Sequence, residues 1–454
     1  MGLSGQLVDE ITAVVGDRWT TSADELARHG QDESWHLPLP PDLVAYPETT
    51  EEVASIVAMC HAAALPVVPF GVGTSLEGGI GAEKGGVCLD LTRMDRILRL
   101  SIDDLDVTVQ AGVTREQLNA DINPRGLMFP VDPGANATIG GMAATGASGT
   151  TTVRYGAMPH NVLGLTVVMA DGRVVRTGGR ARKTSAGYDL TRLFVGSEGT
   201  LGVITEVTLR LWPIPEAIAA ATCAFDSIDS AVDVVIAATQ MALPVARMEL
   251  LDEAAIEAVN AFDDMDLTVA PTLFFEFHGM TAAVDACADE IQALVTDAGG
   301  TFAWAVEAED RSRLWHARHR AYWAMLAMRP GCKGWPTDVC VPISELAQAI
   351  RKAQYDLEES NLYAPLVGHV GDGNFHLCYI IDPNDADEFA RAEAHYERMI
   401  ARALAVGGTC TGEHGIGAGK RDFLRREHPE GIDVMLAIKA ALDPTTTLNP
   451  GKVV

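Results

Sequence analysis

The chain has 454 residues, of which 48% are hydrophobic and 21% charged, and its formal net charge is −28. This length predicts two or three domains with a large apolar core, and the composition excludes global disorder. The acidic balance excludes a nucleic-acid partner, because binding to phosphates needs clustered Lys and Arg side chains.

The N-terminal stretch MGLSGQLVDEITAVVGDRW predicts an amphipathic helix and lacks the long apolar run of a secretory signal. No run of about 18 uncharged apolar residues occurs, so we expect no transmembrane segment. The eight cysteines are scattered and form no C-x-x-C pair, which favours a reduced chain over a disulfide framework. We therefore expect a cytoplasmic protein, with peripheral attachment to a membrane left open.

Short elements separated by turns are predicted in the first part of the chain. Residues 1–35 predict short helices, after which a proline-rich stretch leads into a compact unit. A helix begins near Thr49 or Thr50 and is followed by the buried strand PVVPF. Further strands are predicted in GVCLDLTRM, RILRLSID and DVTVQAGV, and Thr114 caps the next helix.

Three glycine-rich segments interrupt this unit: GVGTSLEGGIG, VDPGANATIGGMAATGASGTTTVRYG and FVGSEGTLGV. The second segment precedes a strand pair whose hairpin turn is Asp171–Gly172. Glycines allow close backbone approach, and free N–H groups in such loops bind anionic groups. The Rossmann spacing fails because position 76 is Leu, and no Walker lysine follows. Composition alone supports a cofactor site and plain structural turns about equally.

A change of pattern near residues 213–216 predicts a domain boundary. Beyond it, strands and helices alternate with longer periods, which predicts an α+β domain with an antiparallel sheet covered by helices. Residues 387–408 form a long amphipathic pattern closed by glycines. This helix leads into the loop GTCTGEHGIGAGK, residues 408–420, and the final segment is extended and broken by prolines.

Two histidines, His369 and His376, flank a turn in HVGDGNFH. Two His and a later Glu form a familiar ligand set for a divalent metal, whereas hydrogen-bonding histidines near a turn are the alternative. Glu413 and His414 support the metal interpretation, because neighbouring side chains point in different directions and can divide ligation and proton transfer between them. A capped loop before a helix near Gly419 is the alternative for this pair.

The segments PFGVGTSLEG, PGANATIGGMAATGASGTTTVRYG and GSEGTLGVITEVTLRLWP strongly resemble the flavin domain of FAD-linked oxidases of the vanillyl-alcohol oxidase/PCMH type. The resemblance covers nearly the whole chain. The motifs ARHRAYWAMLAMRPGCKGWPTDVCVPIS, GHVGDGNFH, GTCTGEHGIGAGK and LDPTTTLNPGKV are most similar to the branch that oxidises D-lactate with a cytochrome as acceptor.

This resemblance implies an α+β fold in three parts. They are an N-terminal helical segment (1–35), a PCMH-type FAD-binding domain (36–215) and a C-terminal substrate domain (216–454) with an antiparallel sheet. The last ~45 residues of the substrate domain are expected to return to the flavin site.

The resemblance also implies FAD held mainly by backbone groups. Relatives with covalent flavin use a histidine in the first glycine loop, where this chain has Thr74, Ser75 and Leu76, so we predict non-covalent FAD. The implied FAD contacts are Pro69, Gly71, Val72, Gly73, Thr74, Ser75, Leu76, Pro133, Gly134, Thr138, Ile139, Gly140, Gly141, Ala144, Gly146, Ser148, Gly149, Glu198, Gly202, Val203, Ile204 and Asn449.

For the second half, the resemblance implies a divalent metal, Zn or Mn, bound by His369, His376 and Glu413, with His414 as the general base. Arg318 is assigned to the substrate carboxylate, which its guanidinium fork matches, and Tyr322 and Asn374 are assigned to the substrate pocket. The alternative for Arg318 is a surface arginine in a basic helix. The alternative for Tyr322 is an aromatic residue of the core.

The implied reaction is oxidation of a D-2-hydroxy acid, D-lactate to pyruvate above all, by hydride transfer to flavin N5. Electrons then pass to cytochrome c, a quinone or a flavoprotein. Trp335–Asp338 lacks the lysine that relatives acting on hydroxyglutarate carry, which favours a monocarboxylate. A glycolate oxidase flavin subunit or a D-2-hydroxyglutarate dehydrogenase are the near alternatives, and a metal-dependent hydrolase is the alternative from another class. The oligomeric state is open, with a homodimer among the options.

Overall fold

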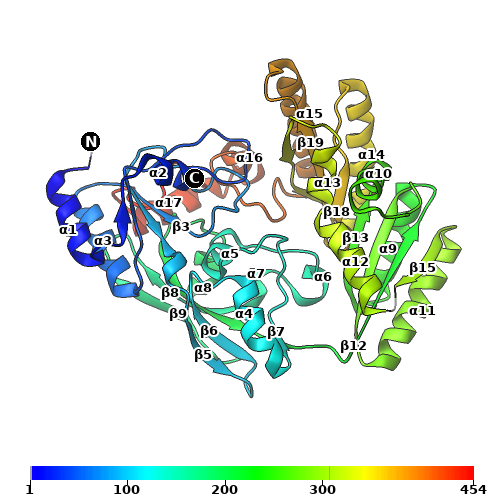
Figure 1. The fold of residues 1–454 in the computed structure, drawn as a ribbon, viewed down its shortest axis with the longest axis horizontal. Helices are drawn as coiled ribbons and strands as arrows, with labels where there is room; N and C mark the ends of the chain where they lie inside the picture. Colours follow the sequence, from blue (N-terminus) through cyan, green and yellow to red (C-terminus); the bar gives the residue numbers. More distant parts are fainter. Residues whose placement is uncertain (1–2, 306) are drawn as a thin grey trace. The chain divides into compact units, whose positions relative to one another are not determined.

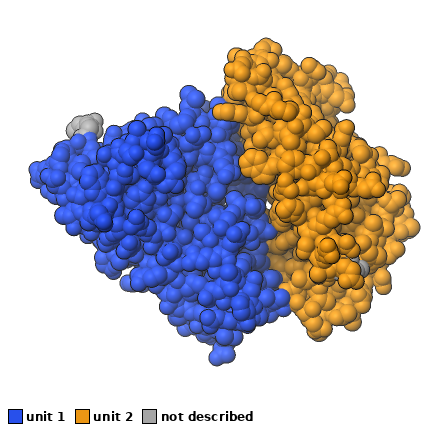
Figure 2. All heavy atoms as spheres, viewed as in Figure 1, with its two compact units in different colours: residues 1–148, 156–214, 413–454 blue, residues 149–155, 215–412 orange. Residues whose placement is uncertain are grey.

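The computed structural model describes residues 3–305 and 307–454. The chain divides into two compact units: unit 1 contains residues 1–148, 156–214 and 413–454, and unit 2 contains residues 149–155 and 215–412 (Figure 2). Both units combine helices with mainly antiparallel sheets, which confirms the α+β class (Figure 1). In the described ranges, no helix is both long enough and apolar enough to cross a membrane.

Unit 1 opens with a four-stranded sheet in the order β1-β2-β4-β3, whose strands are Trp19–Thr20 (β1), Leu43–Ala45 (β2), Val87–Asp90 (β4) and Val67–Phe70 (β3). Strand β4 pairs in parallel with β2 and β3. Helices α1 (Gly5–Val15) and α3 (Thr50–Ala62) pack on this sheet. The Thr49 hydroxyl accepts from Glu52 N at 3.2 Å, so Thr49 rather than Thr50 is the cap of α3.

A second, five-stranded antiparallel sheet has the order β5-β6-β10-β8-β9: Ile97–Ser101 (β5), Asp106–Gln110 (β6), Val203–Arg210 (β10), Val162–Val168 (β8) and Val174–Gly178 (β9). The β8–β9 hairpin turns at Gly172 with φ of +83°, as the Asp-Gly pair predicts. Thr114 caps α4 (Arg115–Ile122) in a capping box with Gln117.

Short helices and strands complete unit 1 around these two sheets. They are α2 (Ala23–His29), η1 (Leu91–Arg93), η2 (Asn123–Arg125), β7 (Leu127–Met128), α5 (Ile139–Thr145), α7 (Met158–Asn161), α8 (Leu190–Phe194), β11 (Trp212–Pro213), α16 (Arg421–Glu427) and α17 (Ile432–Leu442). Strands β7 and β11 form a separate antiparallel pair.

Unit 2 contains an eight-stranded antiparallel sheet in the order β15-β12-β14-β13-β18-β19-β16, with β17 paired to β19. Its strands are Ala217–Ala224 (β12), Val245–Leu251 (β13), Thr272–Gly279 (β14), Thr301–Ala305 (β15), Lys333–Pro336 (β16), Val339–Cys340 (β17), Leu366–His369 (β18) and Asn374–Ile381 (β19). The predicted antiparallel sheet of the second half is therefore present.

Two groups of helices accompany this sheet. Helices α10 (Glu253–Asp263), α12 (Ala308–His319) and α13 (Ala321–Ala327) share one apolar core with residues of β12, β13, β14, β18 and β19. The remaining helices are α6 (Thr152–Tyr155), α9 (Ile228–Gln240), α11 (Thr281–Asp297), α14 (Ile343–Ser360), α15 (Ala386–Ala405) and the turn η3 (Val370–Asp372).

The units divide the chain differently from the predicted domains at residues 149–155 and in the described part of 1–35, and residues 413–454, which were expected to return to the flavin site, lie in unit 1. Residues 149–155 belong to unit 2, because the Arg154 guanidinium donates to Pro244 O and Tyr155 Oη lies 2.8 Å from His278 Nδ1. Residues 413–454 belong to unit 1, where Val67 N donates to Thr447 O at 2.8 Å. The described part of 1–35 is not a separate segment, since α1 contributes to the core of unit 1.

Candidate active site

A cavity in unit 1 is lined by all three glycine-rich segments. Most of the predicted FAD contacts line it: Pro69, Gly71, Val72, Gly73, Thr74, Ser75, Leu76, Pro133, Thr138, Gly140, Gly141, Ala144, Ser148, Glu198, Gly202, Ile204 and Asn449. The others are not among the lining residues: Gly134, Ile139, Gly146, Gly149 and Val203. Ile139 and Val203 are instead fully buried in the apolar cores of unit 1.

Close contacts with neighbouring atoms leave no room for a side chain at two of these positions, Gly71 and Gly140. A Cβ on Gly71 would lie 2.4 Å from Thr138 Oγ1, and one on Gly140 would lie 2.5 Å from Ala111 Cβ. The cavity wall is therefore largely bare backbone and small side chains. Such a wall fits an extended cofactor with an anionic pyrophosphate, because backbone N–H groups bind phosphates and large side chains would obstruct them.

Asp32 supports the first glycine loop and was not predicted from the sequence. Its carboxylate accepts from Ser75 Oγ at 2.8 Å and from Gly79 N at 3.1 Å. Asn449, which was predicted, donates to Gly79 O at 3.0 Å and to Glu198 O at 2.8 Å. These contacts join the N-terminal loops to the C-terminal segment. Asp32 carried no sequence signal beyond being one of the two acids in QDESW.

Glu198 holds the loop that follows His414. Its carboxylate accepts from Ile416 N at 2.7 Å and from Gly417 N at 2.8 Å. Burial raises the pKa of Glu198 to about 7, while the hydrogen bonds from Ile416 and Gly417 act in the opposite direction. This carboxyl therefore titrates near neutral pH beside the cofactor cavity.

Glu413 and His414 both line the cavity of unit 1. Ser148 Oγ donates to Glu413 Oε2 at 2.7 Å, and His414 Nδ1 lies 3.7 Å from Glu77 Oε1. Glu77 also forms an ion pair of 2.9 Å with the buried Lys420. Neither Glu77 nor Lys420 was predicted as a site residue, although both lie within glycine motifs that were singled out. The predicted base thus faces the cofactor cavity and lies beside a buried ion pair.

The register of unit 2 explains why His369 and His376 meet. In the β18–β19 pair, Val367 lies opposite His376 and His369 lies opposite Asn374, so both imidazoles are on the same face. Their ring centroids are 5.4 Å apart. His376 Nδ1 lies 2.7 Å from Thr337 O, and His369 Nδ1 lies 2.8 Å from Glu249 Oε1. Both contacts favour the tautomer that presents Nε2 as a metal ligand.

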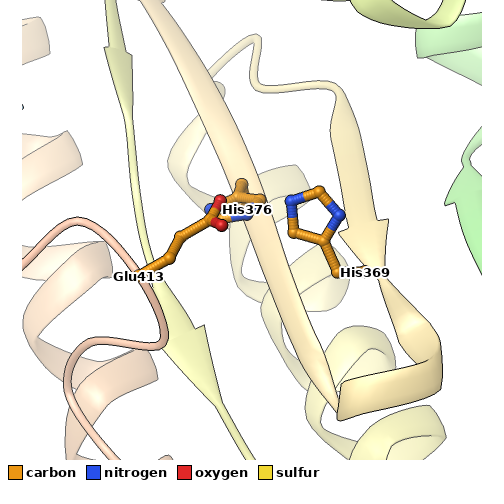
Figure 3. Close-up of side chains that lie close together, drawn as sticks. All are labelled: His369, His376 and Glu413. Atoms are coloured by element: carbon orange, nitrogen blue, oxygen red, sulfur yellow. The ribbon is translucent and has the colours of Figure 1, made fainter. Parts of the chain in front are cut away.

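The ligand atoms of His369, His376 and Glu413 all lie within 4.8 Å of one another (Figure 3). Glu413 directly follows Gly412, the last residue of unit 2, and Thr411 Oγ1 donates to the buried Asp338 at 2.7 Å. The loop before Glu413 is thereby tied to the strands that carry the histidines. Two imidazoles and a carboxylate with hydrogen-bonded outer atoms fit a divalent metal such as Zn or Mn.

Arg318 lies on α12 and is 8% exposed. Its Nη2 donates to Glu249, the same carboxylate that contacts His369. Among the described residues its buried Nε has no hydrogen-bond partner. Burial raises the pKa of Glu249, but the neighbouring His369 and Arg318 outweigh burial and hold the net pKa below the usual value. Arg318 is therefore no surface arginine.

Two predicted substrate residues also have structural contacts. The Asn374 amide donates to Asp338 Oδ1 at 2.7 Å and to Val339 O at 2.8 Å, so both of its N–H groups are used inside unit 2. Tyr322 packs against the core on α13, where the lack of a side chain on Gly334 leaves room for its hydroxyl. Their roles toward a substrate remain predictions.

Known proteins resemble this chain over its whole length. The family model described as FAD binding domain matches residues 41–178, and the one described as FAD linked oxidases, C-terminal domain, matches residues 214–453. A Danio rerio protein named "Probable D-lactate dehydrogenase, mitochondrial" is 51% identical over 454 residues, which cover 99% of this chain and 91% of that protein.

A second relative and one solved structure extend the comparison. The Arabidopsis thaliana protein named "D-lactate dehydrogenase (cytochrome), mitochondrial" is 44% identical over 453 residues, which cover 99% of this chain and 80% of that protein. The structure of p-cresol methylhydroxylase with substrate bound superposes with a TM-score of 0.80 at 18% identity, over 100% of this chain and 98% of that one. This last likeness shows a shared PCMH-type fold.

Proposed function

Because the chain belongs to the family of FAD-linked oxidases, we propose that it oxidises D-2-hydroxy acids, with D-lactate as the main substrate and pyruvate as the product. The names of its relatives support this choice of substrate. The observation that carries the proposal is the buried Arg318 with a donor Nε, joined through Glu249 to His369. A buried guanidinium beside a histidine pair suits a small anion with a neighbouring hydroxyl.

In the proposed reaction, Arg318 binds the substrate carboxylate and orients the molecule. His414 takes the hydroxyl proton as the C=O bond of the product forms. Non-covalent FAD, when bound, supplies the acceptor for the hydride that leaves Cα. A divalent metal, when bound by His369, His376 and Glu413, lowers the pKa of the substrate hydroxyl.

The substrate is proposed to carry a single carboxylate. Pro336 ends strand β16, where it pairs with Cys378, and it is followed by the buried Thr337 and Asp338. No lysine occupies Trp335–Asp338, and the nearby Lys333 at the start of β16 is exposed, so this stretch offers no buried cation for a second carboxylate. A D-2-hydroxy acid with a small apolar side chain therefore fits better than a dicarboxylate.

The electron acceptor is proposed to be a cytochrome, with a quinone or a flavoprotein as the alternatives. The name of the Arabidopsis thaliana relative supports the cytochrome. Both reported relatives are named mitochondrial, so the cytoplasmic location expected from the sequence stays a prediction, as does a homodimer.

Anaerobic mixing tests the proposed reaction. The purified protein should be yellow, with flavin absorbance near 450 nm, and D-lactate should bleach it faster than L-lactate, glycolate or D-2-hydroxyglutarate. Stopped-flow absorbance gives the rate for each acid. A colourless protein would instead support the metal-dependent hydrolase, and equal rates for D- and L-lactate would exclude the proposed role of the site.

Substitution of the proposed base tests the role of His414. His414→Ala should keep its FAD and lose roughly 10²–10⁴-fold in the rate of flavin reduction by D-lactate, the usual contribution of a general base. His428→Ala is the matched control, because His428 lies in the same C-terminal segment with an exposed side chain. Reduction of the His414→Ala flavin at the wild-type rate would show that another group takes the proton.

A further inference from the structure

Glu249 lies at the centre of a buried cluster of charged side chains in unit 2. It is 1% exposed and sits on β13, where its neighbours Leu250 and Leu251 pair with Gly368 and Val367 of β18. One step further along this register, Glu249 lies opposite His369. Its two carboxylate oxygens are 2.8 and 2.9 Å from His369 Nδ1, and Oε2 also accepts from Arg318 Nη2.

We propose that Glu249 is a shared positioning residue for the metal-binding histidine and the substrate-binding arginine. Its contact with His369 Nδ1 sets the ring so that Nε2 is presented to the metal. Its contact with Arg318 Nη2 holds the guanidinium, while the buried Nε remains a donor for the substrate carboxylate. This inference rests on the proposed function of Arg318 and His369.

The burial of Glu249 and Arg318 makes the shared carboxylate necessary. A buried guanidinium is costly without an anionic partner, and Glu249 is the acceptor that the structure gives to Arg318. The same anion stabilises the histidine orientation that a cation site needs. Loss of the Glu249 charge should therefore affect metal binding and substrate binding together, rather than either one alone.

A second cluster of the same composition lies on the neighbouring strand and provides a matched control. Glu276 on β14 is 6% exposed, its Oε1 is 2.7 Å from His278 Nε2, and Arg247 Nε is 3.5 Å away. Tyr155 Oη contacts the other nitrogen of His278 at 2.8 Å. This cluster has the same residue types around a buried carboxylate but no part in the proposed site.

The test compares Glu249→Gln with Glu276→Gln in the FAD-loaded, full-length protein. Chelator-treated protein is titrated with Zn²⁺ or Mn²⁺ alone in competition with a chromophoric chelator, which measures metal affinity without any substrate. The KM and kcat for D-lactate are measured separately. Arg318→Met serves as a third variant that removes only the substrate half of the cluster.

Glu249→Gln should weaken metal affinity about 10–100-fold and raise KM, whereas Glu276→Gln should change neither. Arg318→Met should raise KM and leave metal affinity near the wild-type value. Wild-type metal affinity in Glu249→Gln, or an equal loss in Glu276→Gln, would overturn the inference. If Glu249→Gln does not retain FAD, Glu249→Asp replaces it, and its shortened carboxylate should weaken metal binding to an intermediate degree.

The metal titration separates this inference from the proposed function. A wild-type protein that binds the metal but is not reduced by D-lactate would contradict the proposed substrate. The metal affinity of Glu249→Gln would then still decide whether Glu249 positions His369. A wild-type protein that binds no divalent metal would overturn this inference and the proposed metal assistance, but not the proposed substrate.

Discussion

Buried carboxylates surround the residues to which we assign chemistry. Glu77 lies beside His414, Glu198 holds the backbone of the following loop, and Glu249 joins Arg318 to His369. A buried carboxylate is stable only with hydrogen bonds or opposite charges, and each of these three has them. At the scale of single residues, buried acids therefore lie against the proposed base, the loop that follows it and the substrate arginine.

The titration of Glu198 predicts a pH-dependent stability. Because its folded pKa is raised to about 7 from 4.5, its contribution to stability is complete below pH 4.5 and is lost as the pH rises through 7. Glu198→Gln cannot ionise, so between pH 5 and 8 its unfolding free energy should gain on the order of 2 kcal/mol relative to wild type. Thermal melting across this pH range measures the difference.

The exposed Glu116→Gln in the same unit serves as the control for Glu198→Gln. A stability difference between Glu198→Gln and wild type that stays constant from pH 5 to 8 would show that Glu198 does not titrate in this range.

At the scale of elements, the cofactor cavity depends on the close packing of α5 against Ala111. Gly140 N donates to Ala111 O at 2.8 Å, and a Cβ on Gly140 would lie 2.8 Å from that oxygen and 2.5 Å from Ala111 Cβ. Ala111 directly follows β6, so the helix rests on the end of the five-stranded sheet. This packing sets the position of the backbone that lines the cavity.

Gly140→Ala should displace α5 and weaken FAD binding, because overpacking against backbone costs about 1–3 kcal/mol. The fraction of FAD retained after gel filtration, read from absorbance near 450 nm, measures the loss. Gly179→Ala is the control, since its Cβ would meet no atom within 4 Å at an exposed position. Wild-type FAD retention in Gly140→Ala would mean that α5 can shift without affecting the cavity.

At the scale of the whole molecule, most of the proposed metal and substrate residues belong to a different unit from the flavin cavity, with Glu413 and His414 of unit 1 as the exceptions. The glycine-lined cavity consists of unit 1 residues, whereas Arg318, Glu249 and the two histidines belong to unit 2. Each unit has its own sheets and its own apolar core. Retention of the flavin and binding of the metal should therefore be separable by experiment.

Removal of the metal by a chelator should leave FAD bound and absorbance near 450 nm unchanged. Reduction by D-lactate should slow roughly 100-fold or more, because a Lewis acid contributes several kcal/mol to such a step. Stopped-flow absorbance gives the rates of flavin reduction before and after chelation. Added Zn²⁺ or Mn²⁺ should restore the rate measured before chelation. Reduction at full speed by protein shown by elemental analysis to be metal-free would exclude metal assistance.

Local patterns in the sequence determined much of this protein. Thr49 and Thr114 cap their helices, Asp171–Gly172 form a hairpin turn, and the glycine segments line one cavity, because these features depend on residues close together in the chain. The motif residues His369, His376 and Glu413 were also identified from their spacing and from the resemblance.

Only the tertiary structure showed which residues, distant in the sequence, face these motif residues. Glu249 and His369 are 120 residues apart, and Glu249 and Arg318 are 69 apart, so no local pattern connects them. Strand register brings them together, and register is set by apolar faces packing across the whole sheet. The sequence by itself determined the chemical groups and their local turns. Long-range packing decided their partners, because burial and pairing of charges depend on contacts that only the complete fold creates.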